Sequence, residues 1–248
     1  KGKGLACYLA RQGFDVYVAD LRGRGQSTPS IKEDPNHGQY HSIVEDIPNM
    51  IEFVAKQTSQ SIHLICHSWG GVLVSSSLLR QQNLSSHIRS MVCFGTKRQV
   101  TVWSLERFLK VDLFWHRAAQ WLSKKYGYLD AVKLKAGSDN ETHGTLTEAA
   151  SWVKKSAWTD PVDQFDYGSL AASFNWPPTW HLTGIKDNVL GHRQDVKLFI
   201  NESNPSAQFS LLSKPNGNSE DYDHINILTH PSAVKDHFPS IVNWLKEH

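Results

Sequence analysis

Ser68 stands where a strand is predicted to break sharply into a helix. The stretch 62–67 is largely apolar and is predicted to form a strand buried on both faces. The stretch 70–79 begins with two glycines and continues as an apolar helical pattern. A serine at the apex of such a turn, the nucleophile elbow, presents its hydroxyl to a substrate carbonyl while helix N–H groups face the developing oxyanion. The chemistry predicted is nucleophilic attack on an acyl carbon.

The residues around Ser68 must be small, because the backbone at the apex of this turn is strained. Gly70 and Gly71 meet that need on the helix side, and Cys66 occupies the strand position where the motif G-x-S-x-G has glycine. The alternative is that Ser68 lies in an ordinary loop between a strand and a helix. Cys66 is not expected to be the nucleophile, since burial in a strand disfavours its thiolate.

An activated serine needs a base that takes its proton and an acid that holds the base in the correct tautomer. Asp187 follows a predicted strand at 177–183 and a glycine turn, and His224 follows a predicted strand at 207–213. The alternative bases are His63 in a strand, His67 beside the elbow, and His230 and His237 near the last helix. The alternative acids are Asp195, which lies in a helix, and Asp160, Asp163 and Asp166, which we interpret as solvated charges or helix caps.

The remaining elements must position these residues, and strands alternate with helices along the chain. Further strands are predicted at 14–20 and 88–94, and helices at 5–11, 40–57 with an interruption at Pro48, 194–200, and 234–247 with a bend at Pro239. This alternation predicts an α/β fold with a mostly parallel sheet and helices on both faces.

The loop at 21–29 contains a Gly-x-Gly sequence but lacks the third glycine and the following helix of a dinucleotide-binding loop. We therefore reject a dinucleotide site. Asp20, Arg22 and Ser27 are instead expected to shape this loop beside the site.

Residues 97–176 differ from the rest of the chain, because they show helical patterns without a convincing central strand. Six of the nine tryptophans lie there, at positions 103, 115, 121, 152, 158 and 176. We interpret 97–176 as a helical cap inserted into a core formed by 1–96 and 177–248. Most of these aromatic side chains are expected to form the cap's own small core, and a minority to line a pocket for an apolar substrate.

Composition excludes several classes of protein. The 26 basic and 24 acidic residues nearly balance, which argues against nucleic-acid binding. No apolar run approaches the roughly 20 residues of a membrane-spanning helix. Three scattered cysteines indicate reduced thiols and favour a cytoplasmic location. No Cys/His spacing suggests a metal, and the predicted chemistry needs no cofactor.

Four stretches outside the cap together resemble the α/β-hydrolase superfamily, and specifically its capped esterase and lipase-like branch. These stretches are 18–27 (VADLRGRGQS), 67–71 (HSWGG), 182–187 (LTGIKD) and 223–225 (DHI). That family has its nucleophile, acid and base in the chain order Ser, Asp or Glu, His. The resemblance therefore implies Ser68 as nucleophile, Asp187 as acid and His224 as base, with the Trp69 N–H binding the oxyanion.

The function that the resemblance implies is hydrolysis of a carboxylic ester with a fairly apolar acyl or alcohol group, through an acyl-enzyme. Alternatives with the same triad are a thioesterase, an amidase or a carbon–carbon bond hydrolase. A further alternative is a non-catalytic binding protein with this fold. Neither substrate identity nor oligomeric state follows from the sequence.

The family pattern also differs from this sequence at its beginning. The family has strands ahead of the first predicted helix, and a loop that carries a second oxyanion donor. We therefore expect the natural protein to carry roughly 40–80 residues ahead of Lys1, including that donor.

Overall fold

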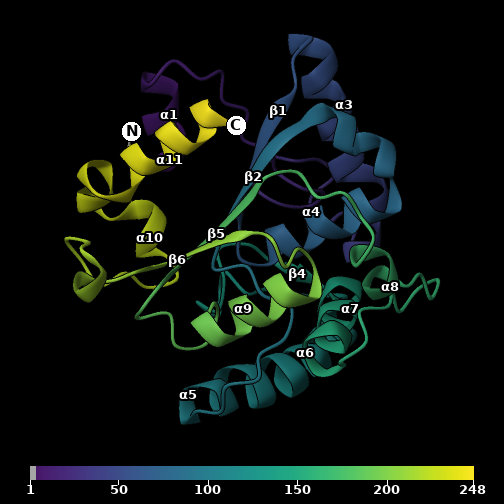
Figure 1. Ribbon diagram of the computed structural model, residues 1–248. Coiled ribbons are helices and arrows are strands. Elements are labelled where there is room, and N and C mark those ends of the chain that lie inside the picture. Colours follow the sequence, from purple (N-terminus) through teal and green to yellow (C-terminus); the bar gives the residue numbers. More distant parts are fainter. Residues whose placement is uncertain (1–3) are drawn as a thin grey trace.

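The computed structural model describes residues 4–248, and its centre is a sheet of four parallel strands (Figure 1). In the order in which they pair, these are β1 (Ile62–His67), β2 (Ile88–Phe94), β5 (Thr179–Gly184) and β6 (Gln208–Leu212). A separate antiparallel ribbon pairs β3 (Tyr128–Leu129) with β4 (Glu141–Thr142). The predicted α/β class with a parallel sheet is confirmed.

Helices connect the strands and cover both faces of the sheet. The α-helices are α1 (Leu5–Arg11), α2 (Gln39–His41), α3 (Ile47–Thr58), α4 (Trp69–Arg80), α5 (Leu105–Arg107), α6 (Ala119–Tyr126), α7 (His143–Lys154), α8 (Tyr167–Ala171), α9 (Arg193–Glu202), α10 (Asn226–Thr229) and α11 (His237–Glu247). The segments η1 (Ser42–Asp46) and η3 (Phe108–Ala118) are π-helical, and η2 (Gln82–His87), η4 (Lys214–Asn216) and η5 (Pro231–Lys235) are 3₁₀ turns.

Two prolines lie in the first turns of helical segments. Pro48 is the second residue of α3, and the predicted 40–57 helix runs on through it as α2, η1 and α3, with the π-helical segment directly before α3. Pro239 lies in the first turn of α11, which begins at His237 after η5 has ended. The predicted bend at Pro239 is therefore a break between two helical segments.

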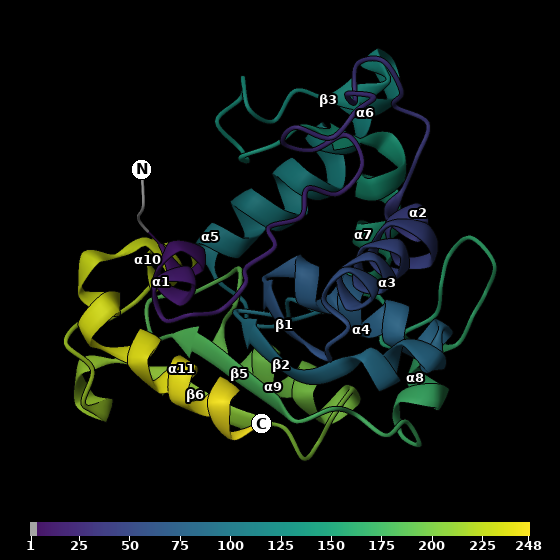
Figure 2. The same cartoon turned by 90° about the horizontal axis from the view of Figure 1, so that it is seen from above.

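The side chains of β2 alternate between two hydrophobic clusters, one on each face of the sheet. Met91 and Cys93 belong to a cluster with residues of α3, α4 and α9, whereas Val92 and Phe94 belong to a cluster with residues of α1 and α11. All four side chains are buried, as expected for a parallel strand with helices on both faces. Figure 1 shows α11 and α9 on opposite sides of this sheet, which Figure 2 views from the side of α11.

The predicted strand at 14–20 was wrong, and so was the complete burial of β1. Residues 14–21 are extended but pair with no strand, and Val18 is 77% exposed. Ile65 of β1 is 38% exposed. Within residues 4–248, no strand pairs with the edge of β1 that faces away from β2. An extended segment without a neighbouring ladder gains no backbone hydrogen bonds and no cross-strand packing, which explains both differences.

Residues 97–176 carry α5 to α8, η3 and the β3–β4 ribbon, and none of them joins the four-stranded sheet. In Figure 1, α5 and α6 lie below the sheet, whereas α1 and α11 lie above it. The tryptophans of residues 97–176 do not all form the separate core that was expected for the cap. Trp152 and Trp158 are fully buried in the cluster that contains α4, whereas Trp103 and Trp121 are exposed.

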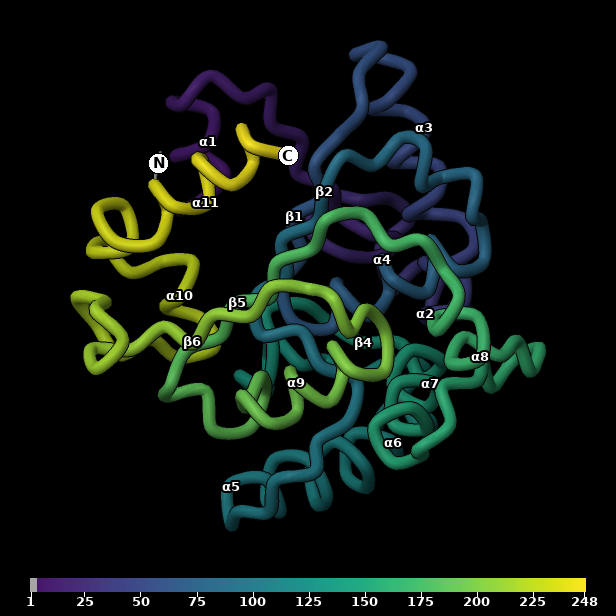
Figure 3. Tube along the Cα trace, in the orientation of Figure 1, coloured from purple at the N-terminus to yellow at the C-terminus, as the bar shows by residue number. Residues whose placement is uncertain are grey.

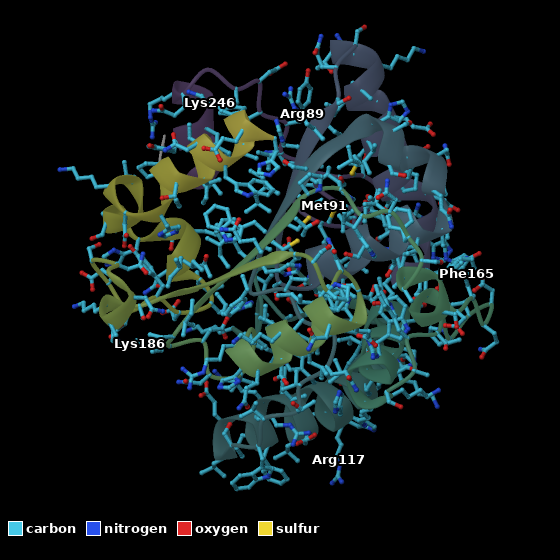
Figure 4. The ribbon with its side chains drawn as sticks, viewed as in Figure 1. Arg89, Met91, Arg117, Phe165, Lys186 and Lys246 are labelled. Atoms are coloured by element: carbon cyan, nitrogen blue, oxygen red, sulfur yellow. The ribbon has the colours of Figure 1, made fainter. Side chains whose placement is uncertain are left out.

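Helix α1 at the beginning of the described chain packs beside α11 at its end (Figure 3). Figure 4 places Met91 near the middle of the sheet, and Lys186 in the loop after β5. None of the helices in residues 4–248 combines the length and the hydropathy that crossing a membrane requires.

Candidate active site

Ser68 occupies a strained position between β1, which ends at His67, and α4, which begins at Trp69. Its backbone has φ 52° and ψ −125°, which places a non-glycine residue in a region that L-residues rarely adopt. The Ser68 N–H donates to the Phe94 carbonyl at the end of β2, with a nitrogen–oxygen distance of 2.7 Å. This geometry is that of the predicted elbow, and Ser68 is half-buried at its apex.

Only one of the two glycines after Ser68 is required by close packing. A Cβ atom on Gly71 would lie 2.4 Å from Oγ1 of Thr96, a residue that is fully buried. A Cβ atom on Gly70 would have no neighbour within 4 Å. A small residue is therefore required at Gly71, because Thr96 in the segment that follows β2 leaves no room for a side chain there.

Cys66 is buried and lies opposite Cys93 in the β1–β2 ladder. A hydrogen bond to Cys66, together with burial, raises the pKa of the Cys93 thiol well above its usual value. Cys66 shares this buried environment, in agreement with the expectation that it is not the nucleophile.

Asp187 and His224 are brought together although 37 positions separate them. Nδ1 of His224 lies 2.5 Å from Oδ2 of Asp187, and the two side chains are 10% and 3% exposed. Oδ1 of Asp187 accepts a hydrogen bond from the Gly191 N–H at 2.7 Å. A buried carboxylate that bonds Nδ1 fixes the imidazole with its Nε2 directed away from the acid.

Gly95 connects this pair to the elbow. A Cβ atom on Gly95 would lie 3.0 Å from His224 Nδ1 and 3.3 Å from Asp187 Oδ2, and the residue has φ 56°. Gly95 directly follows Phe94, whose carbonyl accepts the Ser68 N–H. The candidate nucleophile, acid and base therefore surround one short stretch at the carboxyl end of β2.

Among the described residues, no hydrogen bond joins the Ser68 hydroxyl to the His224 ring, so the contact expected between them is not formed in this conformation. Hydrogen bonds of this kind are often long in unliganded sites and tighten when substrate binds. The His67 ring, which precedes Ser68, lies against the His224 ring with centroids 4.7 Å apart.

The rival carboxylates have other partners. Asp160 was expected to be a solvated charge or cap, but it is 1% exposed and accepts hydrogen bonds from Arg80 and Tyr167. The interpretation failed because the buried Arg80 stabilises the Asp160 carboxylate from a distant helix. Asp163 also pairs with Arg80, and Asp166 caps α8 as expected.

The rival histidines also have structural partners. His63 bonds the Ser90 hydroxyl at 2.7 Å, and His237 bonds the Ile227 carbonyl at 2.7 Å. The glycine-rich loop bonds both within itself and to other segments. The Ser27 hydroxyl donates to the Asp20 carbonyl at 2.7 Å, and the Arg22 guanidinium forms an ion pair with Asp46.

Trp69 is the first residue of α4, a position where a backbone N–H has no partner within the helix. Its indole Nε1–H donates to Gln39 Oε1 at 2.9 Å, and the Lys97 ammonium lies 5.6 Å from its ring centroid. Burial lowers the pKa of Lys97, while Asp187 and Asp195 oppose that shift. The Trp69 indole therefore contacts both Gln39 and Lys97, beside the Trp69 backbone N–H that follows Ser68. Sequence reasoning did not identify Gln39 or Lys97, because both come from distant segments.

Residues 97–176 reach this site through α7. The Trp152 ring centroid lies 6.2 Å from that of Trp69, and Glu148 Oε2 accepts the Tyr40 N–H at 2.9 Å.

A cavity of about 640 Å³ elsewhere is lined by Ile88 and by residues 173–178, at the amino ends of β2 and β5. It lies at the opposite end of the strands from Ser68 and is not part of this site.

Comparisons with known proteins identify the family and the fold of this chain. Residues 2–212 match the family model described as serine aminopeptidase, S33. Among solved structures, a monoglyceride lipase variant from Saccharomyces cerevisiae has a TM-score of 0.66 and 16% identity, covering 98% of this chain and 80% of that one. A monoacylglycerol lipase from Paleococcus ferrophilus has a TM-score of 0.58 and 17% identity, covering 97% and 86%.

Two curated proteins match shorter stretches. A tear acid lipase-like protein of Mesocricetus auratus is 32% identical over 97 residues, and a probable lysophospholipase L2 of Haemophilus influenzae is 32% identical over 93 residues. These matches cover 36% and 37% of this chain, and only 24% and 29% of the relatives' own lengths.

Proposed function

Because the chain belongs to the serine aminopeptidase S33 family of α/β-hydrolases, we propose that it is a serine hydrolase with Ser68, Asp187 and His224 as its catalytic triad. The observation that carries the proposal is the buried hydrogen bond between His224 Nδ1 and Asp187 Oδ2, next to the strained backbone of Ser68. A histidine with its Nδ1 bound to a carboxylate is prepared to take a proton at Nε2.

In the proposed mechanism, Ser68 Oγ attacks the acyl carbon while His224 Nε2 takes the hydroxyl proton. Asp187 stabilises the imidazolium, and the Trp69 N–H at the start of α4 donates to the oxyanion. His224 then protonates the leaving group, which departs and leaves an acyl group on Ser68. Water that loses its proton to His224 attacks this acyl group, the bond from the acyl carbon to Ser68 Oγ breaks, and His224 returns the proton to Oγ as the acid leaves.

The substrate proposed first is a carboxylic ester with an apolar acyl or alcohol group. Two observations support it: the names of the curated relatives are a lipase-like protein and a probable lysophospholipase, and the cap is rich in exposed apolar side chains. These side chains are Trp103, Leu105, Phe108, Leu109, Leu113, Trp121 and Tyr126.

The test uses p-nitrophenyl esters of rising acyl length with the wild-type chain, Ser68→Ala, and the control Ser173→Ala at an exposed serine. We expect wild-type and control rates to agree, and Ser68→Ala to lose at least about 10,000-fold in kcat with an unchanged circular dichroism spectrum. Hydrolysis by Ser68→Ala at the wild-type rate would contradict the proposal.

A second candidate is amide hydrolysis, which is favoured by the description of the family model as a serine aminopeptidase. The same triad would serve, with His224 protonating the leaving amine. Aminoacyl p-nitroanilides separate the two candidates: an ester hydrolase would cleave the esters with much higher kcat/KM, and the reverse ranking would favour the peptidase.

A further inference from the structure

His67 touches the proposed base in two ways, from the position adjacent to the proposed nucleophile. Its Nε2 atom lies 2.8 Å from the backbone carbonyl oxygen of His224. Its ring centroid lies 4.7 Å from that of His224, with the planes 41° apart. We infer that His67 is a positioning residue that holds the backbone and the ring of His224 against the elbow. This inference rests on the proposed roles of Ser68 and His224.

The hydrogen bond defines the tautomer of His67. A backbone carbonyl can only accept, so Nε2 of His67 must carry a proton. Burial lowers the pKa of His67 below its usual value, and the neighbouring His224 lowers it further. The ring is therefore neutral at pH 7 with its proton on Nε2.

The loop that carries His224 gains from such an external bond, because its neighbours bond mainly to one another. The Asp223 carboxylate accepts the N–H groups of Ile225 and Asn226 at 2.9 and 2.7 Å. These bonds shape the turn but do not connect it to the elbow. His67 supplies a connection at the base itself, and it does so from the residue before Ser68.

The consequence is a fixed separation between nucleophile and base. His67 and Ser68 are consecutive, so the His67 bond links the His224 carbonyl to the backbone that presents the Ser68 hydroxyl. A loop that lost this bond would let the imidazole shift relative to Ser68, and a misplacement of 1 Å in an active site can reduce turnover about 100-fold.

Two variants separate the hydrogen bond from packing. His67→Phe keeps an aromatic ring against His224 but removes the donor, whereas His67→Gln keeps a donor at a similar reach. We expect His67→Phe to lose about 10- to 100-fold in kcat with little change in KM, and His67→Gln to recover most of that loss. Equal losses in both variants, or wild-type kcat in His67→Phe, would overturn the inference.

A second measurement does not depend on enzymatic activity. The ¹⁵N chemical shifts of histidine-labelled wild-type protein distinguish a ring protonated on Nε2 from one protonated on Nδ1, and His67→Gln assigns the signal. We expect the Nε2–H tautomer for His67 at pH 7; the Nδ1–H tautomer would contradict the bond. Absence of hydrolysis in the wild-type chain would refute the proposed function, whereas an active wild type with wild-type turnover in His67→Phe would refute only the role of His67.

Discussion

Asp187 shows at the scale of one residue how the fold prepares a proton transfer. Its two carboxylate oxygens have separate partners, since Oδ2 bonds His224 Nδ1 and Oδ1 accepts the Gly191 N–H. The side chain is almost fully buried, so water does not compete for these bonds. The carboxylate therefore both orients the imidazole and stabilises the positive charge that it gains during catalysis.

Replacing Asp187 with asparagine tests this role. The asparagine carbonyl can still accept the Gly191 N–H, but its amide group would face Nδ1 and favour the wrong imidazole tautomer. We expect Asp187→Asn to reduce kcat about 10,000-fold with a small change in melting temperature. The control is Asp195→Asn, which removes a buried carboxylate that binds Thr101 instead. A loss in Asp195→Asn as large as in Asp187→Asn would show that the effect is not specific to the proposed acid.

The residues of the site were predictable to different degrees. Ser68, Asp187 and His224 were predicted to act together because each follows a predicted strand in the order of the family, and the structure brings Asp187 and His224 into contact. Neither the bond from His67 to the His224 carbonyl nor the buried pair of Arg80 with Asp160 follows from local sequence. Both depend on which distant segments meet.

At the scale of elements, the turn from β1 to α4 depends on the segment that follows β2. Gly71 faces the buried side chain of Thr96, whereas Gly70 faces open space. We expect Gly71→Ala to destabilise the protein by about 1–3 kcal/mol, since Thr96 cannot move without overpacking the core. Gly70→Ala is the matched control, and is expected to be neutral or to stabilise α4 by up to about 1 kcal/mol.

Urea denaturation of the two variants measures these effects. Equal stabilities for Gly70→Ala and Gly71→Ala would contradict the proposed steric role of Thr96.

The elements themselves were predicted well where local pattern was sufficient. Helix α1, strand β2 and the helix after the elbow agree with the predicted ranges, because their periodicity and end signals lie within the segment. The 14–20 segment was wrong because strand formation requires a neighbouring ladder, which no local pattern encodes.

At the scale of the whole molecule, Glu148 joins the cap to the core. Its carboxylate accepts the Tyr40 N–H at the start of α2, and burial raises its pKa to about 7. In the unfolded chain this group has a pKa near 4.5. Between pH 4.5 and pH 7, the folded state therefore holds a proton that the unfolded state has lost. Stability should therefore decrease as pH rises from 4.5 to 7. Solvent screening of this partly exposed group limits the effect to about 1–2 kcal/mol.

Glu148→Gln tests this linkage, because glutamine stays neutral and can still accept the Tyr40 N–H. We expect the variant to equal wild type near pH 5 and to be more stable by about 1–2 kcal/mol at pH 8. The control Glu52→Gln removes the same charge from an exposed position on α3. A stability difference for Glu148→Gln that does not change between pH 5 and pH 8 would refute the linkage.

The proposed role of residues 97–176 in substrate selection can be tested by changing only the part of them that does not pack in the main core. Trp152, Trp158 and Tyr167 pack with α4, so removal of all of 97–176 would open the core. We propose instead to replace residues 103–126 with a short linker. The account predicts a larger loss for long-chain esters than for acetate esters, measured as kcat/KM. Equal losses for both would indicate that these helices have only a structural role.

The predicted aromatic core of residues 97–176 forms only in part. Trp115 packs within the outer part of the cap, as expected, but Trp152 and Trp158 join the main core. Spacing of tryptophans along a sequence indicates helical faces and does not specify which face of another segment they meet.

The central claim is that Ser68 is the nucleophile, and covalent labelling tests it most directly. A fluorophosphonate should phosphonylate the wild-type chain, and peptide mass spectrometry should locate the adduct on Ser68. Labelling should be absent in Ser68→Ala, strongly slowed in His224→Ala, and unchanged in Ser173→Ala. An adduct on another residue, or full labelling of Ser68→Ala, would contradict the account.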